Sequence, residues 1–117
     1  MSTVRSWWEE NRAKTQRFYN TVLEAPGEAP VRCEPWINRA IIMQHLYSPA
    51  MWSIFQLQDL FGISESLRRE NPDEERINQP ANPKHYWRYR MHIPLEQLIK
   101  ENAFNEELRD YITHSNR

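Results

Sequence analysis

Apolar and charged residues separate onto different helical faces near the start of the chain. Across residues 3–24, Val4, Trp7, Trp8, Thr15, Phe18 and Val22 fall near one face, while most charged side chains lie elsewhere. Pro26, Gly27 and Pro30 then interrupt the pattern. The pattern predicts one helix over 3–24 and then a loop over 25–34.

A second helix is expected over residues 35–47. Glu34 and Pro35 suit a helix start, because an acid is favourable near the N-terminus and proline is tolerated at the first position. The residues that repeat at helical spacing are Trp36, Ile37, Ala40, Ile41, Gln44 and Tyr47. This helix should end before Pro49, because the residue preceding a proline is pushed out of the α region.

Residues 51–57 form a short and nearly continuous apolar run. Such a run is typical of a strand covered on both faces, as in a parallel sheet, although a buried helical turn gives the same pattern. In a strand, Trp52 and Ile54 face one side and Met51, Phe55 and Leu57 the other, so neither side should be fully solvated. We expect a strand over 51–57.

The last third of the chain combines a long loop with a return to helix. Residues 71–93 are rich in proline, asparagine and aspartate and have little periodicity, which predicts a loop. Residues 94–114 predict helices that open at Pro94 and break near Asn102. The expected fold class is mainly α with one or two short strands.

Composition excludes several function classes. The net charge of -1 argues against a general nucleic-acid or membrane footprint, and no apolar run approaches the ~20 residues of a membrane helix. Cys33 is the single cysteine, so no internal disulfide forms, which fits a reducing, cytoplasmic compartment. The four histidines are scattered and Cys33 has no partner at metal spacing, so we expect neither a metal nor a cofactor.

The segment 76–90 is the one dense group of candidate binding residues, because it mixes amides, aromatic rings and cations. Amides bind hydroxyls and ring faces cover a pyranose, which suits sugars. Cations with rings suit single-stranded nucleic acid equally well. The plainest alternative is that Trp87 and Tyr89 anchor the loop to the core, in which case Trp87→Ala lowers stability. The adjacent Glu74 and Glu75 are expected on a solvated face.

Three motifs in this order resemble glycoside hydrolase family 77, the 4-α-glucanotransferases. They are Gln58-Asp59-Leu60 with Gly62, then Arg76-Ile77-Asn78-Gln79-Pro80, then Tyr86-Trp87-Arg88-Tyr89-Arg90. Residues 81–92 most resemble the branch that includes the plant cytosolic disproportionating enzyme and its bacterial relatives. Residues 2–8 are similar to the segment directly after the Thr-His-Asp motif that bears the family's third catalytic acid.

The resemblance implies a (β/α)8-barrel enzyme that transfers α-1,4-linked glucosyl units with retention. The required nucleophile and acid/base, ~5–5.5 Å apart, lie upstream in the family, so no catalytic residue is expected here. Residues 1–117 are then the C-terminal piece of such an enzyme, with 51–57 as the last barrel strand. Asn78 matches a position that touches glucan, and Gln79 departs from the aromatic residue often found next.

The resemblance implies a maltooligosaccharide or glucan as the substrate partner. A lone apolar strand with open edges also predicts self-association. The alternative function is a stand-alone helical interaction module whose loop 76–92 binds a partner or single-stranded nucleic acid.

Overall fold

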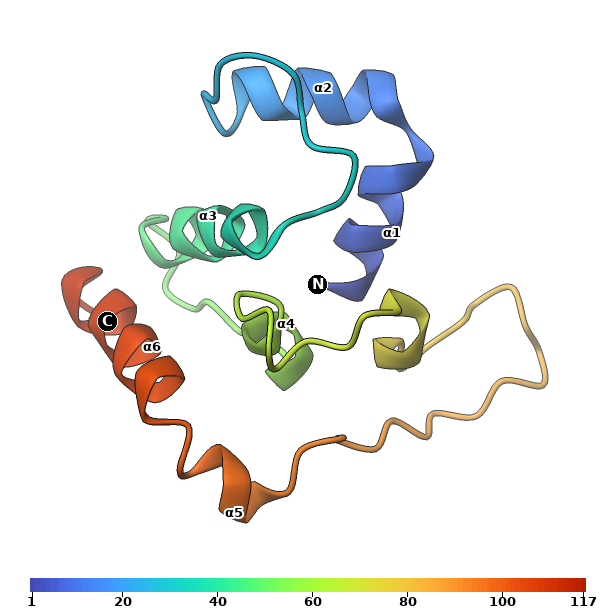
Figure 1. The fold of residues 1–117 in the computed structure, drawn as a ribbon, viewed down its shortest axis with the longest axis vertical. Coiled ribbons are helices and arrows are strands. Elements are labelled where there is room, and N and C mark those ends of the chain that lie inside the picture. Colours follow the sequence, from blue (N-terminus) through green and yellow to red (C-terminus); the bar gives the residue numbers. More distant parts are fainter.

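The computed structural model describes residues 1–117, and all of its regular structure is helical. The elements are α1 (Ser2–Glu10), α2 (Arg12–Thr21), α3 (Pro35–Leu46), α4 (Leu57–Phe61), the 3₁₀ helix η1 (Pro72–Glu75), α5 (Leu95–Leu98) and α6 (Asn102–His114). Helix α3 lies between the α1–α2 pair and α6 (Figure 1). None of the helices combines the length and apolar composition needed to cross a membrane.

Helix α3 is central because both of its sides are covered. It begins at Pro35 after an extended Glu34, as the proline and acid suggested. One side contributes Ile37 and Ile41 to a core cluster with Trp8, Ala29 and Cys33. The other side contributes Ile42 and Leu46 to a second cluster, whose other members are Phe61, Ile63, Leu67, Ile93 and Phe104. The hydrophobic interior is therefore divided in two by one helix.

The first cluster is closed by the loop over residues 25–34. Trp8 is fully buried, and its Nε1 donates a hydrogen bond to the carbonyl of Pro30 at 2.9 Å. Arg12 donates from Nη1 to the same carbonyl at 2.7 Å and from Nη2 to the carbonyl of Ala29 at 2.8 Å. These bonds satisfy loop carbonyls that burial would otherwise leave unpaired.

The single helix expected over 3–24 is wrong, because the chain turns between α1 and α2 at Asn11 (φ -134°, ψ 76°). The Asn11 side chain accepts a hydrogen bond from the Lys14 amide at 3.3 Å and so caps α2. The buried Thr15 hydroxyl donates to the carbonyl of Trp8 at 2.9 Å. Short polar side chains that bond the backbone in this way favour caps over helix interiors.

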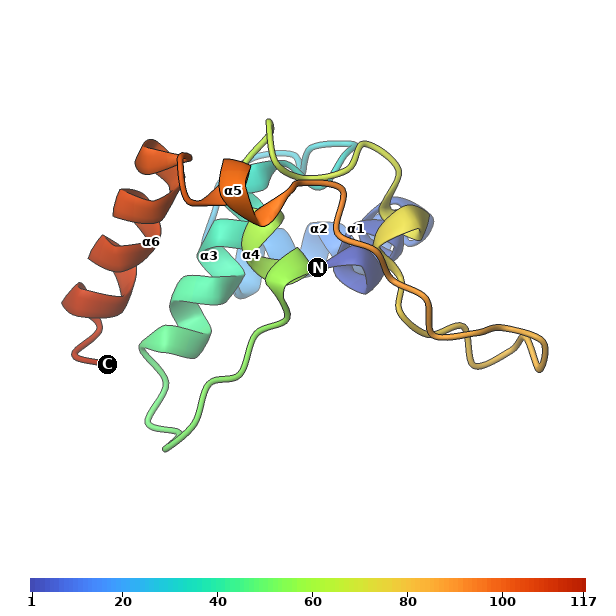
Figure 2. The same cartoon turned by 90° about the horizontal axis from the view of Figure 1, so that it is seen from below.

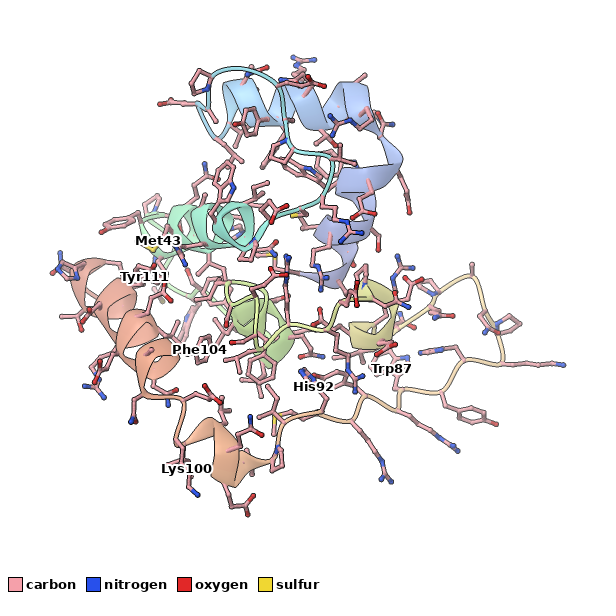
Figure 3. All side chains as sticks on the ribbon, viewed as in Figure 1. Met43, Trp87, His92, Lys100, Phe104 and Tyr111 are labelled. Carbon is pink, nitrogen blue, oxygen red and sulfur yellow. The ribbon has the colours of Figure 1, made fainter.

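Helix α6 packs beside α3 through both polar and apolar contacts. Arg39 Nη2 lies 2.8 Å from Glu107 Oε1, and the Tyr111 hydroxyl donates to the same carboxylate. Burial and this hydrogen bond raise the pKa of Tyr111 to about 12. Met43 of α3 and Tyr111 of α6 both pack against the second cluster (Figure 3).

The strand expected over 51–57 is wrong, and the structure contains no strand or sheet. Residues 51–56 are irregular, and α4 begins at Leu57. Met51, Trp52 and Ile54 are 85%, 76% and 87% exposed, whereas Phe55 and Leu57 pack against the second cluster, so the segment is covered on one side only and not on both as expected. The physical reason is that a strand needs a neighbour for its backbone hydrogen bonds, and residues 1–117 place none beside this segment. None of the strands that build a (β/α)8 barrel is present.

The C-terminal region contains two helices, α5 and α6, with an interruption at residues 99–101. The carbonyl of Leu98, at the end of α5, accepts hydrogen bonds from the Glu101 amide at 3.2 Å and from Asn105 Nδ2 at 2.9 Å. The loop expected over 71–93 contains η1 at its start and is otherwise irregular.

Candidate functional site

The segment directly after η1, residues 76–92, projects from the helices as a long loop (Figures 1 and 2). It contains Asn78 and the aromatic–basic residues 86–90. Because it leaves and rejoins the helical body at neighbouring points, the contacts at its two ends determine how it is held.

The outgoing end is fixed by a buried ion pair between α1 and η1. Arg5 Nη1 lies 3.2 Å from Glu75 Oε2, and the two side chains are 7% and 0% exposed. Glu75 Oε1 accepts a hydrogen bond from the Arg69 amide at 2.9 Å, and Arg5 Nη2 donates to the carbonyl of Glu70 at 2.8 Å. Both charges are thus paired and hydrogen-bonded, as burial requires.

The returning end is fixed by His92 and Ile93. His92 Nε2 is 2.8 Å from the carbonyl of Leu67, so this nitrogen carries the proton and donates. The His92 ring meets Phe61 edge-on at 5.9 Å, and the next residue, Ile93, is buried in the second cluster. Figure 3 labels Trp87 and His92 on this arm.

Two hydrogen bonds join the arms of the loop between its fixed ends. Trp87 Nε1 donates to Asn78 Oδ1 at 3.1 Å, and His85 Nε2 donates to the carbonyl of Ile77 at 2.9 Å. Asn78 and Trp87 are both exposed, and Trp87 retains 73% of its surface. The interpretation of Trp87 as an anchor in the core is therefore wrong, and the stability loss expected for Trp87→Ala has no basis in its burial.

The remaining aromatic residues of the motif sit differently. The ring of Tyr86 is 70% exposed and is covered by the guanidinium of Arg88, with Cζ 5.0 Å from the ring centroid. The hydroxyl of Tyr89 is buried without a hydrogen-bond partner. Burial first, and then the negative charge of Glu75, raise the pKa of Tyr89, while Arg69 opposes the shift. The Tyr89 hydroxyl therefore faces the body of the protein near Glu75 and Arg69, unlike the exposed rings of Tyr86 and Trp87.

Glu75 was not predicted to be buried, since the sequence pattern placed it beside Glu74 on a solvated face. The two neighbours differ sharply, because Glu74 is 51% exposed and pairs with Arg69 at the surface, whereas Glu75 is buried. One signal was available: Asn71 and Pro72 start a helical turn, and the Asn71 side chain accepts from the Asp73 amide at 3.0 Å. That turn orients Glu75, but its partner Arg5 is remote in sequence.

The histidines and the cysteine have structural partners. Each histidine ring meets a backbone carbonyl: His45 with Ile41, His85 with Ile77, His92 with Leu67 and His114 with Asp110. Burial raises the pKa of the Cys33 thiol to about 12, which makes it a poor nucleophile and ligand at neutral pH. No group of three or more His, Cys, Asp or Glu residues is placed to hold a metal ion.

Comparison with known proteins agrees with the resemblance carried by these motifs. The sequence profile of glycoside hydrolase family 77, described as 4-alpha-glucanotransferase, matches residues 1–96. The chain therefore belongs to the 4-alpha-glucanotransferase family. No solved structure matches it.

Two relatives show how much of such an enzyme this chain represents. One is the 4-alpha-glucanotransferase DPE2 of Oryza sativa subsp. japonica, 41% identical over 116 residues, which cover 99% of this chain and 12% of the relative. The other is a 4-alpha-glucanotransferase of Chlamydia caviae, 26% identical over 109 residues, which cover 92% of this chain and 20% of the relative. The chain thus spans a small part of the length of both.

Proposed function

We propose that residues 1–117 work as part of a 4-α-glucanotransferase, an enzyme that transfers α-1,4-linked glucosyl units between maltooligosaccharides or glucans with retention. The observation that carries this proposal is the 41% identity to the rice enzyme across nearly the whole chain. The lone, buried Cys33 fits an enzyme of a reducing compartment such as the cytoplasm.

Within that enzyme, we assign Asn78 to substrate contact. Its amide lies on a loop whose two ends are held by buried residues, so its position is fixed while its surface stays open. Amide groups pair with sugar hydroxyls, which donate and accept hydrogen bonds. Removing such a contact costs roughly 1–3 kcal/mol in transition-state binding.

The chain by itself should not transfer glucose, because retaining transfer requires a carboxylate nucleophile and a carboxylic acid/base ~5–5.5 Å apart across the sugar. In the family these residues lie upstream of the matched region. The test compares the whole enzyme with the purified 117-residue chain on maltotriose. Glucose and longer dextrins from the chain alone, above a buffer blank, would refute the assignment.

We also propose that the isolated chain self-associates through residues 51–54. The support is an apolar groove of about 280 Å³ whose lining includes Leu46, Met51, Trp52 and Leu108. Exposed apolar patches of this kind mark surfaces that pack against other protein. The stand-alone interaction module is not favoured, because the rice and chlamydial relatives, which match 99% and 92% of this chain, are both 4-alpha-glucanotransferases.

A further inference from the structure

Trp87 is a large aromatic residue that the fold leaves uncovered. Its side chain is 73% exposed, and no aromatic ring or cation stacks on it. Its one hydrogen bond, from Nε1 to Asn78 Oδ1 at 3.1 Å, holds the ring by its edge. The indole is therefore oriented while its faces stay open to solvent.

The neighbouring rings do not share this arrangement. Tyr86 has the guanidinium of Arg88 over its ring at 5.0 Å, and Tyr89 has its hydroxyl buried beside the charges of Glu75 and Arg69. Of the three aromatic residues in the motif, Trp87 alone combines a hydrogen-bonded ring edge with two faces on which no ring or cation stacks.

The hydrogen bond also fixes what Asn78 can offer. An indole N–H only donates, so the amide oxygen of Asn78 must face Trp87 and the amide nitrogen must point away from it. Asn78 then presents N–H donors to a ligand, and these pair with the oxygen of a hydroxyl.

We propose that Trp87 is the platform on which a glucose unit of the substrate stacks, and that Asn78 orients this platform while donating a hydrogen bond to a sugar hydroxyl. This inference rests on the proposed function. A pyranose has an apolar face of C–H groups and a rim of hydroxyls, which matches an indole face with an amide donor at its edge. The bond between His85 and Ile77 and the buried Glu75 hold both residues before substrate arrives, which lowers the ordering cost of binding.

The experiment uses the whole enzyme and measures kcat/KM on maltotriose, the Kd for maltoheptaose by calorimetry, and the melting temperature. Trp87→Ala removes the platform, and Trp87→Phe keeps a ring but loses the N–H. Tyr86→Ala is the matched control, because Tyr86 is adjacent and 70% exposed. Asn78→Ala, alone and combined with Trp87→Ala, completes a double-mutant cycle.

We expect Trp87→Ala to lower kcat/KM and weaken maltoheptaose binding roughly five- to tenfold, the range of a single aromatic contact, without lowering the melting temperature. Trp87→Phe should lose less, and Tyr86→Ala should change less than about twofold. The fold-loss in kcat/KM of the double variant should be smaller than the product of the two single-variant fold-losses, because Asn78 and Trp87 are coupled through their hydrogen bond.

The proposal is overturned if Trp87→Ala retains kcat/KM and Kd within about twofold, or if Tyr86→Ala loses as much. A lower melting temperature of Trp87→Ala at an unchanged Kd would show instead that Trp87 has a structural role. A wild-type enzyme that binds maltoheptaose without transferring glucose would contradict the proposed function but still test Trp87 through Kd. A wild type that does neither contradicts both proposals.

Discussion

Removing the Glu75 carboxylate should destabilise the protein far more than removing the carboxylate beside it. Glu75 is fully buried and faces Arg5 at 3.2 Å, with side-chain exposures of 0% and 7%. At an effective dielectric constant of ~20, two charges at this separation attract by about 5 kcal/mol, which offsets part of the cost of taking both from water. Glu75→Ala leaves the Arg5 cation buried and unpaired.

The expected loss for Glu75→Ala is about 3–5 kcal/mol, the range measured when one partner of a buried pair is removed. In a domain of this size that corresponds to roughly 12–20 °C in melting temperature, at about 4 °C per kcal/mol. Glu75→Gln should lose less, because an amide oxygen still accepts the hydrogen bond from the Arg69 amide. Arg5→Met combined with Glu75→Met should recover most of the loss, since no isolated charge remains.

The assay is urea unfolding monitored by tryptophan fluorescence, for which the buried Trp8 is a suitable reporter. Glu74→Ala is the matched control: its carboxylate is 51% exposed and pairs with Arg69 at the surface, so its loss should stay within about 1 kcal/mol. Equal free energies of unfolding for Glu74→Ala and Glu75→Ala would refute the importance of the buried pair, as would a double substitution no more stable than Glu75→Ala.

Burial of Cys33 and exposure of the 51–54 patch give two further predictions. Because burial raises the pKa of Cys33 from 9.0 to about 12, the neutral thiol is favoured in the folded state. The contribution of this thiol to the free energy of unfolding is therefore present below pH 9 and is lost as the pH rises toward 12. For the same reason, iodoacetamide should alkylate Cys33 much more slowly in the folded protein than in urea-unfolded protein. Equal alkylation rates would contradict this prediction. Ile54→Asp should lower the sedimentation coefficient of the isolated chain at high concentration. The control Val31→Asp should not, because Val31 is 71% exposed but lies outside residues 51–54. A wild-type chain that is monomeric at every concentration would contradict self-association.

Local signals in the sequence predicted the helix that organises the core. Two prolines delimit α3: Pro35, preceded by Glu34, marks its start, and Pro49 marks the region where it must end. The apolar repeat marks the helix between them. These signals suffice because each proline restricts the backbone only within a few residues. Similar signals failed at Asn11, where a cap and the bond from Thr15 to Trp8 outweigh the apolar periodicity on either side.

The apolar run at 51–57 was misjudged because periodicity cannot establish whether a strand has a neighbour. The chain provides no pairing partner, so Trp52 and Ile54 remain exposed and regular structure resumes only at α4. Exposure of an apolar run depends on what packs against it, which no local pattern records.

The candidate site shows the same division between local and distant effects. Residue types alone singled out the loop and Asn78 as candidates for binding sugar. They did not reveal that Trp87 bonds to Asn78 from the opposite arm, or that Glu75 meets Arg5, 70 positions away in the sequence. Pairings across a loop or between distant elements depend on tertiary packing.

The most direct test of the proposed activity and of the role of Asn78 is the disproportionation of maltotriose by the whole enzyme and by its Asn78→Ala variant. Glucose and longer dextrins are separated by chromatography, and the melting temperature of each protein is measured in parallel. We predict transfer by the wild type and a loss of roughly 5- to 150-fold in kcat/KM for Asn78→Ala, equivalent to ~1–3 kcal/mol, at an unchanged melting temperature. An Asn78→Ala variant with full activity would contradict this prediction. So would a wild-type enzyme that forms no products longer than maltotriose.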